Sequence, residues 1–216
     1  NRNAIQWTDD RRVGAFMNVA DPEILRWSAR VLASGGPPST PVFTQNVISG
    51  MRAFEALRLA GITYTVDPNS PYEAFSQDDF AIDYLRFPVE TMVHGAGDCD
   101  DLSVLYATIL ESSGVRTAFI TVPGHILMAF DSGLDPDSLD TLFTSADSFI
   151  LRGGTVWMPV ETTLLAEGFL RAWQEGGLQW RRGNRDGTAG FFTTREAWEA
   201  YAPVSPRTDA EPAAPE

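Results

Sequence analysis

The chain has 216 residues, of which 44% are hydrophobic and 11% aromatic, enough to bury the core of one domain. Its formal charge of −13 has the wrong sign for a protein that binds nucleic acid, and no apolar run reaches the roughly 20 residues of a membrane span. The first residue is Asn1 rather than Met, with no signal peptide after it, so we expect a processed chain or a piece of a longer protein or complex. A single cysteine does not fix the compartment, and we favour an extracytoplasmic, periplasmic location.

Two helices are predicted before residue 61. The first begins at Asp21-Pro22-Glu23, with proline at the first helical position. A break follows at residues 34–41 (SGGPPSTP), which we expect to be a loop that wraps the main domain. The second helix spans Val42 to Ala60 and ends at Gly61. The chain is divided into an N-terminal arm and helix (1–40), a main domain with C-terminal helices (41–203) and a disordered tail rich in Pro, Ala and acid (204–216).

The next segments show weaker patterns. Ile62 to Val66 alternates like a strand, and residues 67–72 have the composition of a turn or loop. Residues 79–93 suggest a short helix followed by an extended segment around Phe87-Pro88.

The stretch from Gly95 to Gly114, GAGDCDDLSVLYATILESSG, contains the only cysteine, Cys99, directly before a helical pattern. Apolar residues recur there at spacings of three and four, which predicts one face of an amphipathic helix. These residues are Leu102, Leu105, Tyr106, Ile109 and Leu110.

Three strands are predicted after this helix, at residues 115–122, 125–130 and 155–160. The Pro123-Gly124 turn joins the first two as a hairpin. Helical pieces follow at 169–174 and 196–201. Helices and strands segregated in this way predict an α+β fold, in which the cysteine-bearing helix packs on a small antiparallel sheet between helical N- and C-terminal extensions.

A nucleophilic cysteine needs a base, and the chain has two histidines. His125 opens the second strand, which a hairpin can carry back past the N-terminus of the Cys99 helix, whereas His94 lies in a Gly-rich loop that would hold a base less rigidly. Glu161, at the end of the third strand, is the candidate that orients the imidazole, and Asp131 is its rival at the far end of the histidine's own strand. The free N–H groups of a helix N-terminus favour the thiolate, whose reference pKa is about 8.5, and stabilise an oxyanion.

Three carboxylates surround Cys99, and we interpret them as structural. One of Asp98, Asp100 and Asp101 caps the helix, and Asp101 holds the loop that carries the thiol. A metal site is not expected, because hard carboxylates with one soft thiolate and no ligand-spaced histidine suit no common ion. Trp157 either lines the cleft or packs in the core. Asp101 and Trp157 are therefore assigned supporting roles.

These motifs together resemble the transglutaminase-like superfamily of papain-fold cysteine enzymes, in particular its bacterial members. The matching segments are Gly97 to Asp101, Gly114 to Thr117, Pro123 to His125 and Trp157 to Thr163. The resemblance covers residues 42 to 163 and implies a papain-like core in which Cys99 is the nucleophile, His125 the base and Glu161 the third member. The chain departs from the family in having Glu161 where an aspartate is usual, and in a short interval between cysteine and histidine that leaves the substrate class open.

The leading hypothesis is therefore a cysteine peptidase or amidase that acts on a protein or peptide substrate. Its thioacyl intermediate passes to water, as in a peptidase or amidase, or to an amine, as in a transglutaminase. We favour water, because the sequence shows nothing dedicated to an amine acceptor, and no cofactor is needed. The alternative is an inactive module of the same fold that binds a peptide or protein within a larger assembly, its cleft occluded by the N-terminal arm or the C-terminal helices.

Overall fold

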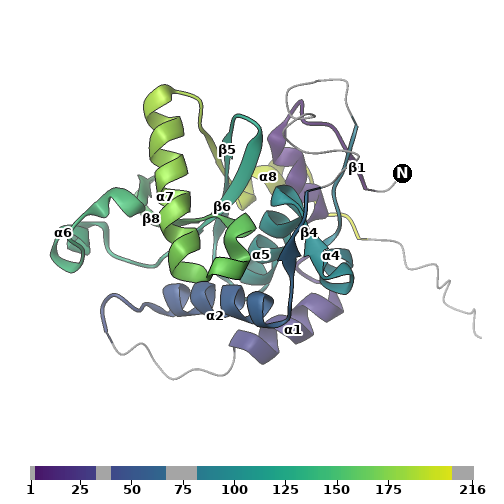
Figure 1. Ribbon diagram of the computed structural model, residues 1–216, viewed down its shortest axis with the longest axis horizontal. Coiled ribbons are helices and arrows are strands. Elements are labelled where there is room, and N and C mark those ends of the chain that lie inside the picture. The colour runs from purple at the N-terminus through teal and green to yellow at the C-terminus, as the bar shows by residue number, and fades with distance from the viewer. Residues whose placement is uncertain (1–2, 33–39, 67–81, 206–216) are drawn as a thin grey trace, which may run out of the picture.

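A five-stranded antiparallel sheet organises the structure, a computed structural model that describes residues 3–32, 40–66 and 82–205 (Figure 1). Its strands are β5 (Thr117–Val122), β6 (His125–Asp131), β7 (Ile150–Arg152), β8 (Thr155–Val160) and β9 (Gly190–Thr193). Their order across the sheet is β7-β8-β6-β5-β9. Two short strand pairs lie outside it, β1 (Ala4–Ile5) with β3 (Asp83–Tyr84) and β2 (Thr63–Tyr64) with β4 (Ala96–Gly97).

The described helices vary greatly in length. The α-helices are α1 (Pro22–Leu32), α2 (Gln45–Leu59), α4 (Pro88–His94), α5 (Cys99–Ser112), α6 (Leu139–Leu142), α7 (Phe169–Asp186) and α8 (Thr194–Ala200). The 3-10 helices are η1 (Asp10–Phe16), η2 (Pro136–Ser138), η3 (Ala146–Ser148) and η4 (Thr162–Glu167). Within the described ranges, no helix combines the length and the apolar character that crossing a bilayer requires.

The predicted α+β class and antiparallel sheet are confirmed. The pairing of Val122 with His125 leaves a two-residue hairpin loop, Pro123-Gly124, in which Gly124 takes a positive φ of 71°. Strand β8 pairs with the other side of β6, so the start of β6 and the end of β8 lie at the same end of the sheet. Strands β7 and β9 were not predicted. Most of the loop at 34–41, the turn at 67–72 and the tail from residue 206 lie outside the described residues.

Helix α5 is the central helix of the molecule. It packs against β6 on one side and against α1, α2 and α4 on others, so every residue from Cys99 to Leu110 is buried. Two of its buried hydroxyl groups find partners inside the protein, Ser103 with the Thr162 hydroxyl at 3.0 Å and Thr108 with its own helix backbone. The sequence predicts burial of one apolar face, whereas the structure buries this helix on all sides.

Two helix predictions were wrong in their order or extent. In residues 82–94 the extended segment precedes the helix, because Pro88 stands at the first helical position and the Glu90 carboxylate accepts the Phe87 N–H at 3.0 Å. Helix α7 continues twelve residues beyond the predicted end at 174. The Gly176-Gly177 pair suggests a break, but a glycine here lets the helix lie directly on the backbone of Pro159.

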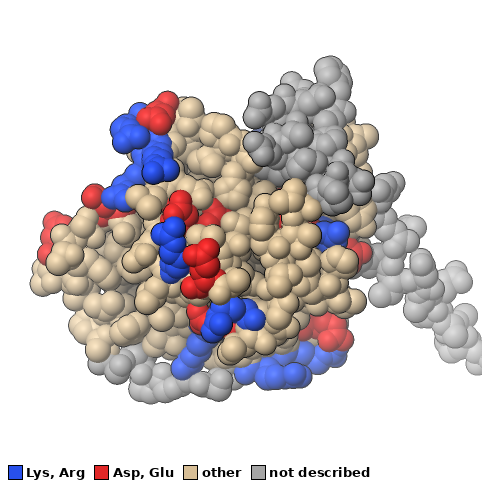
Figure 2. Space-filling model, viewed as in Figure 1, with Lys and Arg blue, Asp and Glu red and all other residues tan. Residues whose placement is uncertain are grey.

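The N-terminal segment packs into the same core as the main domain. Val13 and Ile24 have no exposed surface, and the Trp198 indole donates to the Gly14 carbonyl at 3.1 Å. Val204, the first residue of the predicted disordered tail, is fixed by a backbone hydrogen bond to Ala15. On the face shown in Figure 2, basic and acidic side chains alternate instead of forming one acidic field.

Candidate active site

His125 and Glu161 meet at one end of the sheet. His125 is the first residue of β6, and Glu161 follows the last residue of the neighbouring strand β8. Their side chains form a hydrogen bond of 2.6 Å between Nε2 and Oε2. The Glu161 side chain is 2% exposed and the imidazole 23% exposed, so one edge of the pair reaches solvent.

Glu161 is surrounded by hydrogen-bond donors. Its Oε1 accepts the Thr163 backbone N–H at 3.0 Å and the Thr163 hydroxyl at 2.6 Å. Its Oε2 accepts from His125 and from the Gln179 amide at 2.8 Å. Burial acts to raise the pKa of Glu161, but the hydrogen bonds and charge of His125 and the hydrogen bonds of Thr163 outweigh it, so the pKa is lowered. The carboxylate is therefore held in its ionised form.

Cys99 is the first residue of α5, which packs against β6. It is 6% exposed, and hydrogen bonding to the backbone of Ile126, the neighbour of His125 on β6, acts to lower its pKa. The charge of Glu161 also acts on the thiol. The packing of α5 against β6 thus brings the three predicted site residues into one neighbourhood.

The electrostatics of the thiol differ from the sequence-based expectation. Burial raises the pKa of Cys99 well above its ordinary value, the charges of Asp100 and Asp98 raise it further, and the Ile126 N–H offsets this only in part. The predicted favourable effect of the helix N-terminus is therefore outweighed. Cys99 rests as a protonated thiol.

The carboxylates before and after Cys99 form a buried structural cluster. Asp98 and Asp100 both accept the Asp101 N–H, at 3.3 and 2.8 Å, and Asp101 accepts the Arg86 N–H at 2.7 Å and pairs with its guanidinium. These contacts are the expected ones: Asp98 caps the helix, and Asp101 holds the preceding segment through Arg86. Burial and the neighbouring carboxylates raise the pKa of Asp100 well above its usual range and that of Asp101 to about 6.

This cluster is also the place where a cation would find ligands among the described residues. Carboxylate oxygens of Asp98, Asp100 and Asp101 lie within 4.8 Å of one another. Helix capping and the Arg86 ion pair already engage these groups, and Oδ2 of Asp100 is the one buried oxygen among them without a hydrogen-bond partner. The cluster is accordingly explained as part of the fold.

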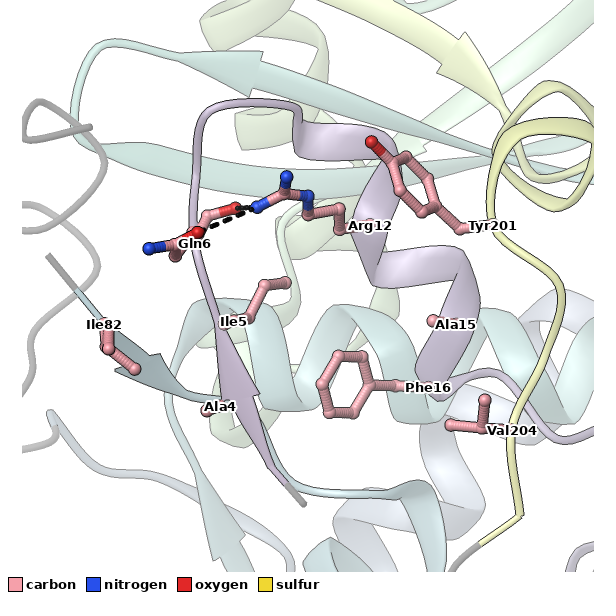
Figure 3. Close-up of a pocket in the computed structure, with 9 residues that line it drawn as sticks. All are labelled: Ala4, Ile5, Gln6, Arg12, Ala15, Phe16, Ile82, Tyr201 and Val204. Atoms are coloured by element: carbon pink, nitrogen blue, oxygen red, sulfur yellow. Dashed lines mark hydrogen bonds between the residues drawn. The ribbon is translucent and has the colours of Figure 1, made fainter. Parts of the chain in front are cut away.

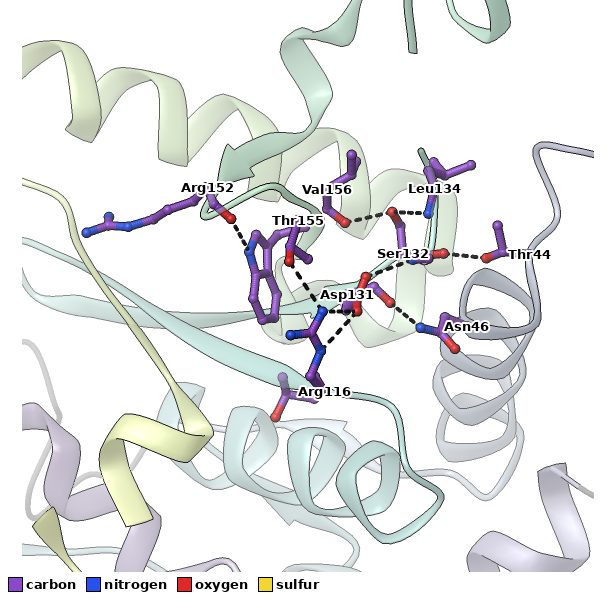
Figure 4. A network of polar contacts seen from close by, with 12 residues as sticks. Thr44, Asn46, Arg116, Asp131, Ser132, Leu134, Arg152, Thr155 and Val156 are labelled. Carbon is purple, nitrogen blue, oxygen red and sulfur yellow. Dashed lines mark hydrogen bonds and ion pairs between the residues drawn. The ribbon is translucent and has the colours of Figure 1, made fainter. Parts of the chain in front are cut away.

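Three other candidates lie away from this pair. Asp131, at the far end of β6, binds Arg116 at 2.7 Å within a separate polar network (Figure 4). Trp157 pairs with Asp131 in register, about 13 Å along β8 from Glu161. It packs in the cluster on the outer face of the sheet, so the structure does not place this predicted supporting residue at the site. His94 is the exposed last residue of α4, not part of a loop.

The described cavities do not coincide with this site. A cavity of about 520 Å³ lies between the N-terminal arm and the C-terminal segment, where Phe16, Ile82 and Tyr201 contribute to its walls (Figure 3). A smaller apolar cavity of about 200 Å³ lies under Phe43 and Trp173. Neither is lined by Cys99 or His125.

Gln179 is the site residue that sequence reasoning missed. It lies on α7 beyond Gly176-Gly177, where a helix break is the natural prediction, so no pattern connected it with Glu161. No protein-family model, curated protein or solved structure matches the chain.

Proposed function

We propose that the protein is a cysteine-dependent acyl-transfer enzyme with a papain-like, transglutaminase-like core, which hydrolyses amide bonds of a protein or peptide. The observation that carries the proposal is the 2.6 Å bond from His125 Nε2 to Glu161 Oε2, beside a cysteine at the N-terminus of a buried helix. A nucleophile, a base and a third group that orients the base are the parts that acyl transfer requires.

Glu161 decides which imidazole nitrogen acts as the base. Because the ionised carboxylate accepts from Nε2–H, the lone pair of the ring lies on Nδ1. The Cys99 proton passes to Nδ1 while the sulfur attacks the carbonyl carbon. The raised pKa of the thiol means that this proton leaves during the attack, not before it.

The remaining steps use the same groups. The new oxyanion is stabilised by the N–H of Cys99, the first of α5, which has no intrahelical acceptor, whereas the Asp101 N–H is already bound by Asp98 and Asp100. The carbon–nitrogen bond then breaks, and the amine leaves with the proton from His125. Water attacks the thioester, gives a proton to His125 and releases the acid, and the proton returns to the sulfur of Cys99.

A second candidate function is a peptide- or protein-binding module that keeps the fold without the chemistry. Two observations favour it: Cys99 is only 6% exposed, and its pKa is raised. In this case the His125–Glu161 pair is a structural contact.

Covalent trapping with a peptide aldehyde or vinyl sulfone, followed by mass spectrometry, separates the two functions. Acyl transfer predicts an adduct on Cys99 and a trapping rate at least about 100-fold lower in His125→Ala, because a positioned base contributes at least that much. His94→Ala is the matched control, since it removes the exposed histidine, and its rate should equal that of the wild type.

Equal trapping rates for the wild type and His125→Ala, or no adduct with either reagent, would overturn the enzyme proposal in favour of the binding module. Thermal unfolding of each variant shows whether a loss of rate comes from a loss of fold.

A further inference from the structure

We propose that Gln179 is a positioning residue, which holds Glu161 as an ionised acceptor for His125. Its amide nitrogen donates to Glu161 Oε2 at 2.8 Å, and this is the oxygen that receives the imidazole at 2.6 Å. The inference rests on the proposed function, because Gln179 acts on the reaction only through Glu161.

The number of donors explains what Gln179 adds. A carboxylate has about four lone-pair positions. Thr163 fills two of them through its N–H and hydroxyl, His125 a third and Gln179 the fourth. A proton on Glu161 would have to face one of these donors, so the full set excludes the neutral acid.

The Glu161 carboxylate sets the orientation of the Gln179 amide, and this orientation leaves the amide oxygen without a partner. With Nε2 directed to Glu161, the Gln179 Oε1 is buried without a hydrogen-bond partner. An unpaired buried acceptor is unfavourable, and an apolar side chain would avoid it. A glutamine in this place is explained by its donor, because packing alone gives no reason to retain it.

Helix α7 is fastened to Glu161 at two points. The Glu161 backbone N–H donates to the Ala172 carbonyl at 3.0 Å, and seven residues later Gln179 reaches the carboxylate of the same residue. Gly176, between them, rests on the backbone of Pro159 and Val160. The close approach of helix and strand brings Gln179 within hydrogen-bond distance.

The consequence is a shift in the pH range over which the pair operates. Among the titratable groups, His125 on β6 is hydrogen-bonded to Glu161, and the charge of Glu161 acts on Cys99 on α5, as do the charges of Asp100 and Asp98. Loss of one donor destabilises the ionised carboxylate. Glu161 would then take up a proton at higher pH and cease to orient the ring.

The test compares Gln179→Met, which keeps the length of the side chain without its donor, with the wild type. Gln174→Met, at an exposed position of the same helix, is the matched control. One readout is the pH dependence of Cys99 trapping, in which the loss of rate that accompanies protonation of Glu161 should begin about one pH unit higher in Gln179→Met. The second readout is the ¹⁵N spectrum of the His125 ring in a His94→Gln background, where a single imidazole remains.

In the wild type the spectrum should show the Nε2–H tautomer, with an acid inflection from Glu161 that moves up by about one pH unit in Gln179→Met. If both readouts stay at their wild-type values in Gln179→Met, the positioning role is wrong, even where trapping shows an active thiol. If the ring inflection moves while no protein is trapped, the positioning role stands and the proposed enzyme function fails. If Gln179→Met unfolds at a lower temperature than the control Gln174→Met, Gln179→Leu is used in its place.

Discussion

Replacing Asp100 by asparagine should stabilise the protein more at pH 8 than at pH 5. Asp100 is fully buried, and its Oδ2 lacks a partner while two further carboxylates lie within 4.8 Å. A single guanidinium, that of Arg86, is paired with this cluster. Asparagine keeps the Oδ1 acceptor for the Asp101 N–H, and its amide can donate to Asp98.

The direction in which the unfolding free energy changes with pH follows from proton uptake by the folded protein. The folded pKa of Asp101 is raised from 3.8 to about 6, and that of Asp100 is also raised, well above its usual range. Between pH 4 and pH 6 the folded protein therefore binds more protons than the unfolded chain, so the free energy of unfolding rises as pH falls. The Asp101 difference alone amounts to about 3 kcal/mol lost above pH 6. Below pH 4 stability declines again, because the pKa of Glu161 is lowered.

Urea unfolding followed by tryptophan fluorescence at pH 5 and pH 8 measures the effect. The wild type should be more stable at pH 5, by about 1.4 kcal/mol from Asp101, whose folded pKa of about 6 lies one unit above that pH, and by a further amount from Asp100. Asp100→Asn should reduce this difference by gaining about 1–3 kcal/mol more at pH 8 than at pH 5. Asp140→Asn, at an exposed position, should preserve the wild-type difference. A loss of stability in Asp100→Asn that is equal at both pH values would refute the reasoning.

Two further changes test the packing and the choice of orienting residue. Gly176→Ala should lower the melting temperature, because the new Cβ would lie 2.8 Å from the Pro159 carbonyl carbon. Each kcal/mol of lost unfolding free energy corresponds to about 2–4 °C. Since alanine is the better helix former, a higher melting temperature would contradict this. Asp131→Asn should cost about 1 kcal/mol or less of unfolding free energy, since its partner Arg116 is 65% exposed, and should leave Cys99 trapping unchanged. A loss of trapping as large as that in Glu161→Gln would instead return Asp131 to the site.

The arrangement of His125 and Glu161 could be predicted because it depends on local rules. Pro123-Gly124 fixes the hairpin, the hairpin fixes where β6 begins, and a neighbouring antiparallel strand must end beside that point. The sequence alone favours Glu161 over Asp131 for the same reason, since the two lie at opposite ends of the sheet.

What could not be predicted depends on packing between distant elements. Gln179 reaches Glu161 because Gly176 lets α7 lie on β8, a contact that no local pattern contains. The rise of the Cys99 pKa has the same origin, because α5 is enclosed by elements distant in the chain and its thiol is removed from water. A helix N-terminus favours a thiolate only where solvent or a cation supports it.

Because α5 is enclosed, its residues are under selection for folding as well as for the proposed chemistry. Residues from Cys99 to Leu110 are core residues, so a descendant that lost its chemistry would still need nearly all of them to fold. The imidazole of His125 is 23% exposed at the end of a strand, so the core does not depend on it in the same way. Under the proposed function, loss of activity among relatives of this chain should therefore be recorded first at the histidine, while the cysteine-bearing helix persists almost unaltered.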